Sequence, residues 1–193
     1  MNMIITIGRE FGSGGRTIGK QVAERLGIPC YDQELIEKIE EKSGLAKEFI
    51  AERGEYTMRG GWLANAFADR SLNGLSVQDY LWTIQRKTIL ELAEEGPCVI
   101  VGRCADYILE GKADLLKVFI HAPIETRAKR IVEKYGESAE APEKRLRDKD
   151  IRRSAYYHFY TDVEWGIAKN YDIALDSGTL GLERCVDIIA SLY

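Results

Sequence analysis

Glycine makes up most of a short segment near the start of the chain, and two polar residues follow it directly. Residues 12–15 read Gly-Ser-Gly-Gly, and an arginine and a threonine come next. A glycine-rich loop lets backbone N–H groups point at an anion, and the N-terminus of a following helix adds a favourable dipole. The guanidinium binds phosphate oxygens, and a threonine hydroxyl can ligate Mg²⁺. The segment therefore predicts a phosphate-binding site made of Gly12, Ser13, Gly14, Gly15, Arg16 and Thr17.

The spacing in this segment matches the phosphate-binding pattern GxxxxGK[ST] only in part. Arg16 stands at the lysine position, and Glu10 stands where the first glycine belongs. Arginine keeps the positive charge but presents a planar fork in place of an ammonium group. Two other interpretations remain open. One is a dinucleotide-binding turn, GxGxxG, with Asp32 as the ribose ligand, in which Thr17 replaces the third glycine; the other is an ordinary strand-to-helix turn.

The elements that must position these residues alternate between two kinds. Five short apolar runs read as strands, and helical periodicity separates each from the next. The runs are centred near Ile4, Cys30, Val99, Val118 and Ile173. Alternation of this kind predicts an α/β fold, a five-stranded parallel sheet with helices on both faces. The carboxyl ends of the strands then lie at one edge, where ligands bind, and residues 12–17, Asp32 and Arg103 all fall at that edge.

Further arginines follow in the second half of the chain. Arg127 and Arg130 are three residues apart on a predicted helix, so they share a face. Six of the ten residues from 144 to 153 are basic. The arginines of this run are Arg145, Arg147, Arg152 and Arg153. Such a run is usually a solvated helix face, but its place before the last strand suits a lid over a bound phosphate.

The organisation expected for the chain is a single domain over residues 1–193, because chains of this length usually form one. A stretch of looser periodicity at residues 45–75 reads as an insert, and it carries Arg59. Residues 137–160 read as the lid region. A glycine cradle, a carboxylate and several arginines match the needs of phosphoryl transfer, in which a protein mainly positions reactants and neutralises charge.

Composition excludes several classes of protein. The chain is 45% hydrophobic and 30% charged with a net charge of −4, so binding of nucleic acid over its surface is not expected. No apolar run approaches the roughly 20 residues of a membrane span, and Met1 leads directly into the first strand, so a cytoplasmic protein without a membrane partner is expected. Four cysteines form no CxxC pair and two histidines lie far apart, which favours buried free thiols over a zinc site.

Three segments resemble the cytidylate kinase-like family of P-loop nucleoside monophosphate kinases. They are residues 7–36 around the glycine loop, residues 99–109 with the sequence VIVGRCADYIL, and residues 144–177 around RDKDIRR. The resemblance spans nearly the whole chain. It implies a five-stranded parallel core with an acceptor-binding insert after the second strand and a lid before the last.

The resemblance also implies cofactors and roles for individual residues. It makes ATP and Mg²⁺ the expected cofactors and a small molecule, CMP-like or dCMP-like, the phosphate acceptor. Residues 12–17 would bind the ATP phosphates, with Thr17 on the metal and Asp32 near it through water. The acceptor would meet Asp32, Arg59 and Arg103. The transferring group would meet Arg16, Arg147 and Arg153, with Arg127, Arg130 and Arg152 in or near the lid.

Four departures from cytidylate kinases are visible in the sequence. Arg16 stands in place of the loop lysine, and Cys104 stands where an aspartate follows the Gly-Arg pair. The helix QELIEKI replaces an arginine-bearing acceptor motif after the second strand, and the lid motif RDxxDxxR is one residue shorter, as RDKDIRR. A fainter similarity to shikimate-type kinases rests on Asp32, the acidic helix after it and Arg59. Two alternatives to a nucleoside monophosphate kinase therefore stay open: a kinase of a small hydroxylated metabolite, and a module that senses ATP without turnover.

Overall fold

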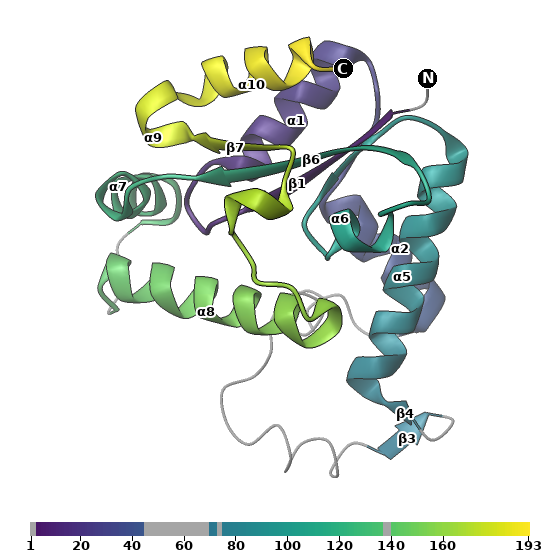
Figure 1. Cartoon of the computed structure of the whole chain (residues 1–193). Coiled ribbons are helices and arrows are strands. Elements are labelled where there is room, and N and C mark those ends of the chain that lie inside the picture. Colours follow the sequence, from purple (N-terminus) through teal and green to yellow (C-terminus); the bar gives the residue numbers. More distant parts are fainter. Residues whose placement is uncertain (1–2, 45–69, 73–74, 137–139) are drawn as a thin grey trace.

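Five parallel strands form the central sheet of the computed structural model, which describes residues 3–44, 70–72, 75–136 and 140–193. Their order is β2-β5-β1-β6-β7, so the first strand of the chain lies in the middle (Figure 1). The strands are β1 Met3–Arg9, β2 Cys30–Tyr31, β5 Val99–Val101, β6 Asp114–His121 and β7 Ile173–Asp176. Every pairing between them is parallel. The predicted five-stranded parallel sheet is confirmed.

Strand β1 lies between β5 and β6, so both of its edges are paired, and helices cover both of its faces. Its whole length pairs with β6, from Met3 beside Asp114 to Arg9 beside Ile120. Ile4 and Ile5 point to opposite faces, as neighbours on a strand do, and both are almost fully buried. The chain therefore leaves the centre of the sheet at Arg9 and enters the glycine-rich loop.

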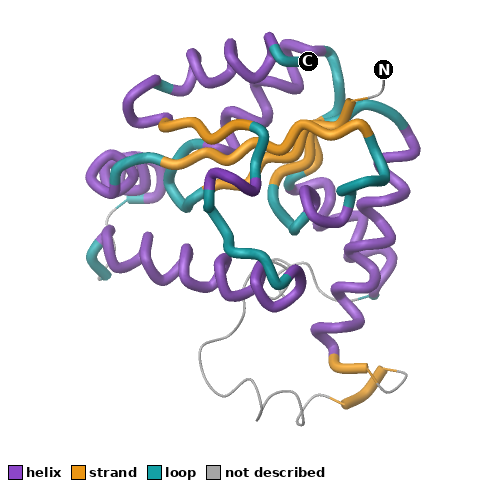
Figure 2. Tube along the Cα trace, viewed as in Figure 1, coloured by secondary structure: helices purple, strands orange, loops and turns teal. Residues whose placement is uncertain are grey.

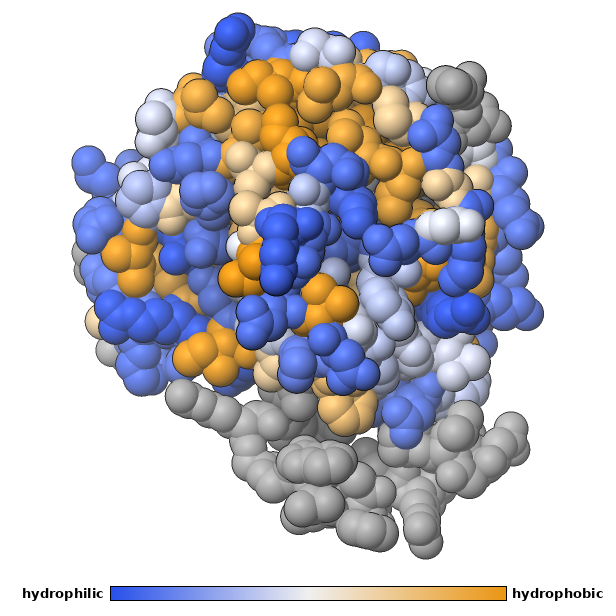
Figure 3. Space-filling view, viewed as in Figure 1, coloured by the Kyte–Doolittle hydropathy of each residue, from blue (hydrophilic) through white to orange (hydrophobic). Residues whose placement is uncertain are grey.

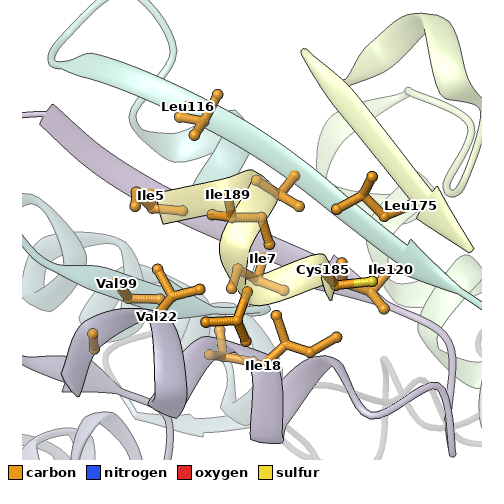
Figure 4. Close-up of a cluster of buried hydrophobic side chains, with 14 residues drawn as sticks. Ile5, Ile7, Ile18, Val22, Val99, Leu116, Ile120, Leu175, Cys185 and Ile189 are labelled. Atoms are coloured by element: carbon orange, nitrogen blue, oxygen red, sulfur yellow. The ribbon is translucent and has the colours of Figure 1, made fainter. Parts of the chain in front are cut away.

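Two helices cover one face of the sheet. Helix α1 (Gly15–Leu26) ends at Gly27, whose φ of 66° is the left-handed conformation that favours glycine, and α10 (Leu182–Ser191) lies beside it. Their apolar side chains meet those of the strands in one buried cluster, here called the first cluster (Figure 4). Its members include Ile5, Ile7, Ile18, Val22, Val99, Leu175, Cys185 and Ile189. The predicted apolar spacing of both helices is thereby accounted for.

Three helices cover the opposite face. They are α2 (Gln33–Ser43), α5 (Val77–Glu95) and the short α6 (Ala105–Ile108). A second cluster of buried side chains joins them to the sheet. Its members include Ile4, Leu35, Ile39, Ile89, Leu92, Ile100 and Ile108. The sheet thus separates two apolar cores, which completes a three-layer arrangement.

The segments before and after the last strand complete the chain. Helix α7 (Ile124–Tyr135) follows β6, and the 20-residue α8 (Pro142–Thr161) packs against it, as Figure 2 also shows. The short elements are β3 (Arg70–Leu72), β4 (Leu75–Ser76), a 3₁₀ turn (Ala168–Asn170) and α9 (Ser177–Leu180). The basic run predicted as part of a lid is therefore one half of a long helix.

The cysteines and two aromatic residues of α8 are largely buried. All four cysteines are free, and Cys98, Cys104 and Cys185 are buried as expected. On α8, Tyr156 and Tyr157 pack into an aromatic cluster with Cys104.

None of the helices in the described ranges combines the length and the apolar composition of a membrane span. On the face shown in Figure 3, hydrophobic residues gather toward the top and hydrophilic residues cover most of the rest.

Candidate functional site

A cavity of about 630 Å³ opens where β1 meets the glycine-rich loop and the N-terminus of α1. It brings together most of the side chains and loop residues that the sequence singled out. Those that line it are Gly12, Gly14, Gly15, Arg16, Thr17, Asp32, Arg103, Arg130 and Arg153. Ser13, also a residue of this loop, is fully buried and does not line the cavity.

The loop has the backbone conformation that binding an anion requires. Gly12 and Gly14 have φ angles of 78° and 83°, in the left-handed region that residues with a Cβ rarely adopt. Ser13 closes the turn, because its hydroxyl donates to the carbonyl of Glu10 at 2.9 Å. Gly14 is the N-cap of α1 and supplies no side-chain cap, so the first N–H groups of the helix remain available to a ligand.

Arg127 secures the start of the loop from beneath. Its Nε donates to the carbonyl of Ala122 at 2.9 Å, and Nη1 lies 2.6 Å from Oδ2 of Asp150 on α8. The other oxygen of Asp150 accepts the Phe11 N–H at 2.7 Å, and Glu10 lies 3.3 Å from the same guanidinium. Arg127 is buried and does not line the cavity, so the structure places it as a support of the loop and of α8.

Arg130 ties the loop to the segment after β7. Its Nη1 donates to the carbonyl of Ser13 at 3.0 Å and to the Ser177 hydroxyl at 2.9 Å, and Nη2 donates to the Ser177 carbonyl at 2.8 Å. The Ser177 hydroxyl in turn donates to the Ser13 carbonyl at 2.5 Å. The guanidinium reaches the cavity, but most of its donors hold protein groups in place.

Arg16 and Asp32 form an ion pair at the side of the cavity nearest β2. Nε of Arg16 lies 2.6 Å from Oδ2 of Asp32, and the exposed fractions of the two side chains are 47% and 4%. Among the described residues no donor makes a hydrogen bond to this Oδ2, although the atom is buried. Arg16, which replaces the lysine of the usual phosphate-binding pattern, is thus about half exposed and pairs with a carboxylate.

Three more arginines that line the cavity are buried. Arg9, Arg103 and Arg153 are 7%, 5% and 8% exposed. Arg153 of α8 donates from Nη1 to the carbonyl of Arg9 at 3.1 Å and lies 5.6 Å from the ring centre of Phe11. Sequence reasoning missed Arg9, although one signal was present: it is the last residue of the central strand, immediately before the loop.

Arg103 lies two residues after β5, and its backbone has an uncommon conformation. Both Arg103 and Cys104 have a positive φ, 62° and 55°, a conformation uncommon for residues with a side chain. The buried amide of Gln85 donates to the Arg103 carbonyl at 3.0 Å and to the Tyr156 hydroxyl at 3.2 Å. Burial raises the pKa of Tyr156 well above its usual value, and the nearby charge of Arg103 lowers it in part. Such local strain is common at functional sites.

Two further predicted arginines do not line the cavity, and a third is not described. Arg147 is exposed on α8, and Arg152 is half-buried; neither lines the cavity. Arg59 lies outside the described residues. Contact of these arginines with a ligand stays a prediction.

The charges around the cavity favour an anionic ligand. Among the described residues, six basic side chains line it and three acidic ones do. The basic ones are Arg9, Arg16, Arg103, Arg130, Lys134 and Arg153, and the acidic ones are Glu10, Asp32 and Glu133. Several cations that converge in a recess raise the local concentration of a polyanion such as a nucleotide.

The residues present also fit a phosphate-bound magnesium ion. Within the described part of the chain, no three His, Cys, Asp or Glu residues gather as a metal cage. Mg²⁺ with a nucleotide does not need one, since it uses one or two protein groups together with phosphate oxygens and water. Thr17 and the buried carboxylate of Asp32 both line the cavity and can supply such groups.

Residues 4–179, which include all strands of the sheet and the loop, match a family model described as the cytidylate kinase-like family. The chain belongs to the cytidylate kinase-like family. A cytidylate kinase of Archaeoglobus fulgidus is 31% identical over 193 residues, covering 97% of this chain and 92% of that protein. A cytidylate kinase of Methanosarcina mazei is 30% identical, covering 97% and 94%.

Solved structures agree with this membership. An uncharacterized protein from Eubacterium ventriosum is 27% identical, with a TM-score of 0.73 and coverage of 98% and 97% of the two chains. A shikimate kinase from Acinetobacter baumannii is 18% identical with a TM-score of 0.56, which shows a shared fold. The protein is therefore a P-loop kinase, a phosphotransferase with a cytidylate kinase-like sequence.

Proposed function

We propose that this kinase transfers the terminal phosphoryl group of ATP to a nucleoside monophosphate, with CMP or dCMP as the acceptor. The observation that carries the proposal is the convergence of three buried guanidinium groups on one cavity beside the N-terminus of α1. Two phosphorylated substrates bring many negative charges into one recess, and buried arginines offset them. The names of the relatives at 30% and 31% identity support the choice of acceptor.

Each side chain has a role that follows from its place. The amides of residues 12–17 hold the ATP phosphates, and Arg103, at the end of β5, holds the phosphate of the acceptor. Arg153 reaches the cavity from α8 and neutralises charge on the group in transfer. Thr17 and Asp32 are the residues that would hold Mg²⁺, directly or through water. When bound, the ion neutralises charge between the ATP phosphates.

The reaction needs no side-chain nucleophile. A phosphate oxygen of the acceptor forms the new bond to phosphorus, the bond to the bridging oxygen of ATP breaks, and ADP leaves with that electron pair. The transition state is largely dissociative, so the protein mainly aligns the two substrates and offsets spreading charge. Removing one preorganised donor of this kind typically lowers kcat by about 10²- to 10³-fold.

A measurement of ADP release tests the proposal. The protein is incubated with ATP, Mg²⁺ and, in turn, CMP, dCMP, UMP, AMP, GMP or shikimate, and the diphosphate product is identified by chromatography. We expect CDP or dCDP to form fastest, with a kcat/KM at least about tenfold above that of any other acceptor, since one or two hydrogen bonds at about 1 kcal/mol each give a difference of this size. In Arg153→Met, kcat should fall by about 10²-fold or more while ATP affinity is largely kept.

The same assay separates the alternatives. ADP released with shikimate or another alcohol, but with no nucleotide acceptor, would indicate a metabolite kinase. Binding of ATP without ADP from any acceptor would indicate a sensor. Either result would replace the proposed function.

A further inference from the structure

The first turn of α1 carries an arginine that pairs with one carboxylate. Arg16 is the second residue of the helix, and both Arg16 and Asp32 line the cavity. Nε of Arg16 lies 2.6 Å from Oδ2 of Asp32, and in the described part of the chain this ion pair is the one interaction of the guanidinium. A guanidinium carries donors on three nitrogens, so contact through Nε leaves the two terminal nitrogens for another acceptor.

The two side chains differ in burial, which decides how a ligand can use them. The Asp32 side chain is 4% exposed, whereas that of Arg16 is 47% exposed. No donor in the described ranges makes a hydrogen bond to Oδ2 of Asp32, so the nearby charge of Arg16 is what offsets the burial of this carboxylate. Removing the cation from a buried ion pair is strongly unfavourable. A ligand therefore binds Arg16 most favourably if Nε keeps its place beside Asp32.

We propose that Arg16 binds the phosphates of ATP through its two terminal nitrogens while Nε stays paired with Asp32. Asp32 is then the positioning residue that holds the guanidinium at the N-terminus of α1. This inference rests on the proposed function. The ligand is the triphosphate of a nucleotide, which the amides of residues 12–17 also contact.

This arrangement gives a reason for arginine at the position of the usual loop lysine. An ammonium group is a single point charge, so a lysine beside Asp32 would have to choose between the carboxylate and the phosphates. A guanidinium is a planar fork that can meet a carboxylate on one side and a phosphate on another. Arg16 and Asp32 therefore act as a unit, and a change in one should alter what the other contributes.

Calorimetric titration with ATP tests the role of Asp32 through the sign of an effect. The titration contains EDTA and neither Mg²⁺ nor acceptor, so that a role of Asp32 toward the metal does not enter. If Asp32 acted through its negative charge alone, Asp32→Asn would strengthen the binding of a polyanion. We expect the opposite, a Kd about three- to tenfold higher, because the guanidinium loses its fixed position. Arg16→Met should raise Kd by about 10- to 100-fold.

Glu133 is the matched control for the loss of a negative charge. It is an exposed carboxylate that lines the same cavity. Glu133→Gln should lower Kd by up to about threefold, since it removes only repulsion. Asp32→Asn in the Arg16→Met background should also lower Kd, because no guanidinium remains to be positioned. Thermal melting checks that each variant is folded.

Arg16→Lys gives a second readout, which a merely structural role of Asp32 would not change. Alone it should raise Kd about tenfold, because the ammonium group stays with the buried carboxylate. Adding Asp32→Asn should bring Kd back to within about threefold of the wild-type value, since the ammonium group is released to the phosphates. The same substitution of Asp32 thus weakens binding in the wild type and strengthens it in the Arg16→Lys background.

The possible results separate this inference from the proposed function. Tighter ATP binding in Asp32→Asn, as in Glu133→Gln, would mean that Asp32 does not position Arg16. Wild-type affinity in Arg16→Met would mean that Arg16 does not bind the phosphates. Both results would overturn the inference and leave the kinase proposal intact. A protein that shows the expected signs but phosphorylates no nucleoside monophosphate would overturn the proposed acceptor and leave the roles of Arg16 and Asp32 standing.

Discussion

Asp106 is a carboxyl group that the structure keeps almost entirely from water. It lies on α6 and is 7% exposed, and the Tyr157 hydroxyl of α8 donates to its Oδ2 at 2.8 Å. Burial raises the pKa of Asp106 above its ordinary value of 3.8; the bond from Tyr157 and the charge of Lys117 lower it only in part. The folded protein therefore holds this proton to a higher pH than the unfolded chain does.

We predict that the buried carboxyl of Asp106 makes the free energy of unfolding depend on pH. Between the unfolded and the folded pKa the folded state binds more protons, so the free energy of unfolding falls as pH rises from about 4 and becomes constant above the folded pKa. Asp106→Asn removes this dependence. Urea unfolding at a series of pH values should show the wild type losing stability relative to Asp106→Asn as pH rises through this window.

Asp176 offers a control of opposite sign. It caps α9 and is half-buried, and hydrogen bonds from Thr179 and from backbone N–H groups lower its pKa. Its stabilising effect is present above the unfolded pKa and is lost as pH falls. The wild type should therefore gain stability relative to Asp176→Asn as pH rises. Equal slopes for the two substitutions would contradict the account of Asp106.

For single residues, the sequence predicted which residue types line the cavity, but it did not predict what each side chain contacts. Gly12, Gly14 and Thr17 were found because a loop pattern depends on the chain alone. The burial of Arg9 at the cavity and the ion pair of Arg16 with Asp32 depend on the direction of each side chain. That information comes from the packing of β1 against α1, which a linear pattern does not contain.

Helices α7 and α8 are held to the glycine-rich loop by a carboxylate in the middle of α8. Asp150 accepts the Phe11 N–H and pairs with Arg127, whose side chain is 9% exposed. Removing one partner of a buried ion pair leaves the other charge uncompensated. Asp150→Ala should therefore lower the free energy of unfolding by about 3 kcal/mol and weaken ATP binding, as the loop loses its support.

Glu143 on the same helix is the matched control. Its side chain is exposed in the first turn of α8, so Glu143→Ala should cost less than about 1 kcal/mol. Urea unfolding and ATP titration of both variants check the difference. A similar loss of stability in the two would mean that Asp150 does not connect α8 to the loop.

Whole elements were easier to predict than their mutual contacts. The five strands of the sheet could be predicted because each is an apolar run between helical segments. Helix α5 ends just before Gly96 and Pro97, two residues that stop a helix. The strand order and the attachment of α8 to the loop could not be predicted from the sequence. Both arise from contacts between residues far apart in the chain, such as the pairing of Ile5 with Leu116 and the hydrogen bond from Phe11 to Asp150.

At the scale of the whole molecule, the sheet separates two apolar cores. Ile189 of α10 and Ile18 of α1 belong to the first cluster, and Ile39 of α2 belongs to the second. All three are at most 1% exposed. Each Ile→Val substitution should lower the free energy of unfolding by about 0.5–1.5 kcal/mol, because it removes one buried methyl group.

The position of the sheet predicts how these losses combine. Ile189→Val with Ile39→Val should cost the sum of the two single losses within about 0.5 kcal/mol, since the sites share no neighbours across the sheet. Ile189→Val with Ile18→Val alters one cluster twice and should depart from the sum by more than that. Urea unfolding of the singles and both doubles measures this. Additivity in both pairs would mean that α1 and α10 do not share a packed core, and coupling across the sheet would mean that the strands transmit repacking from one face to the other.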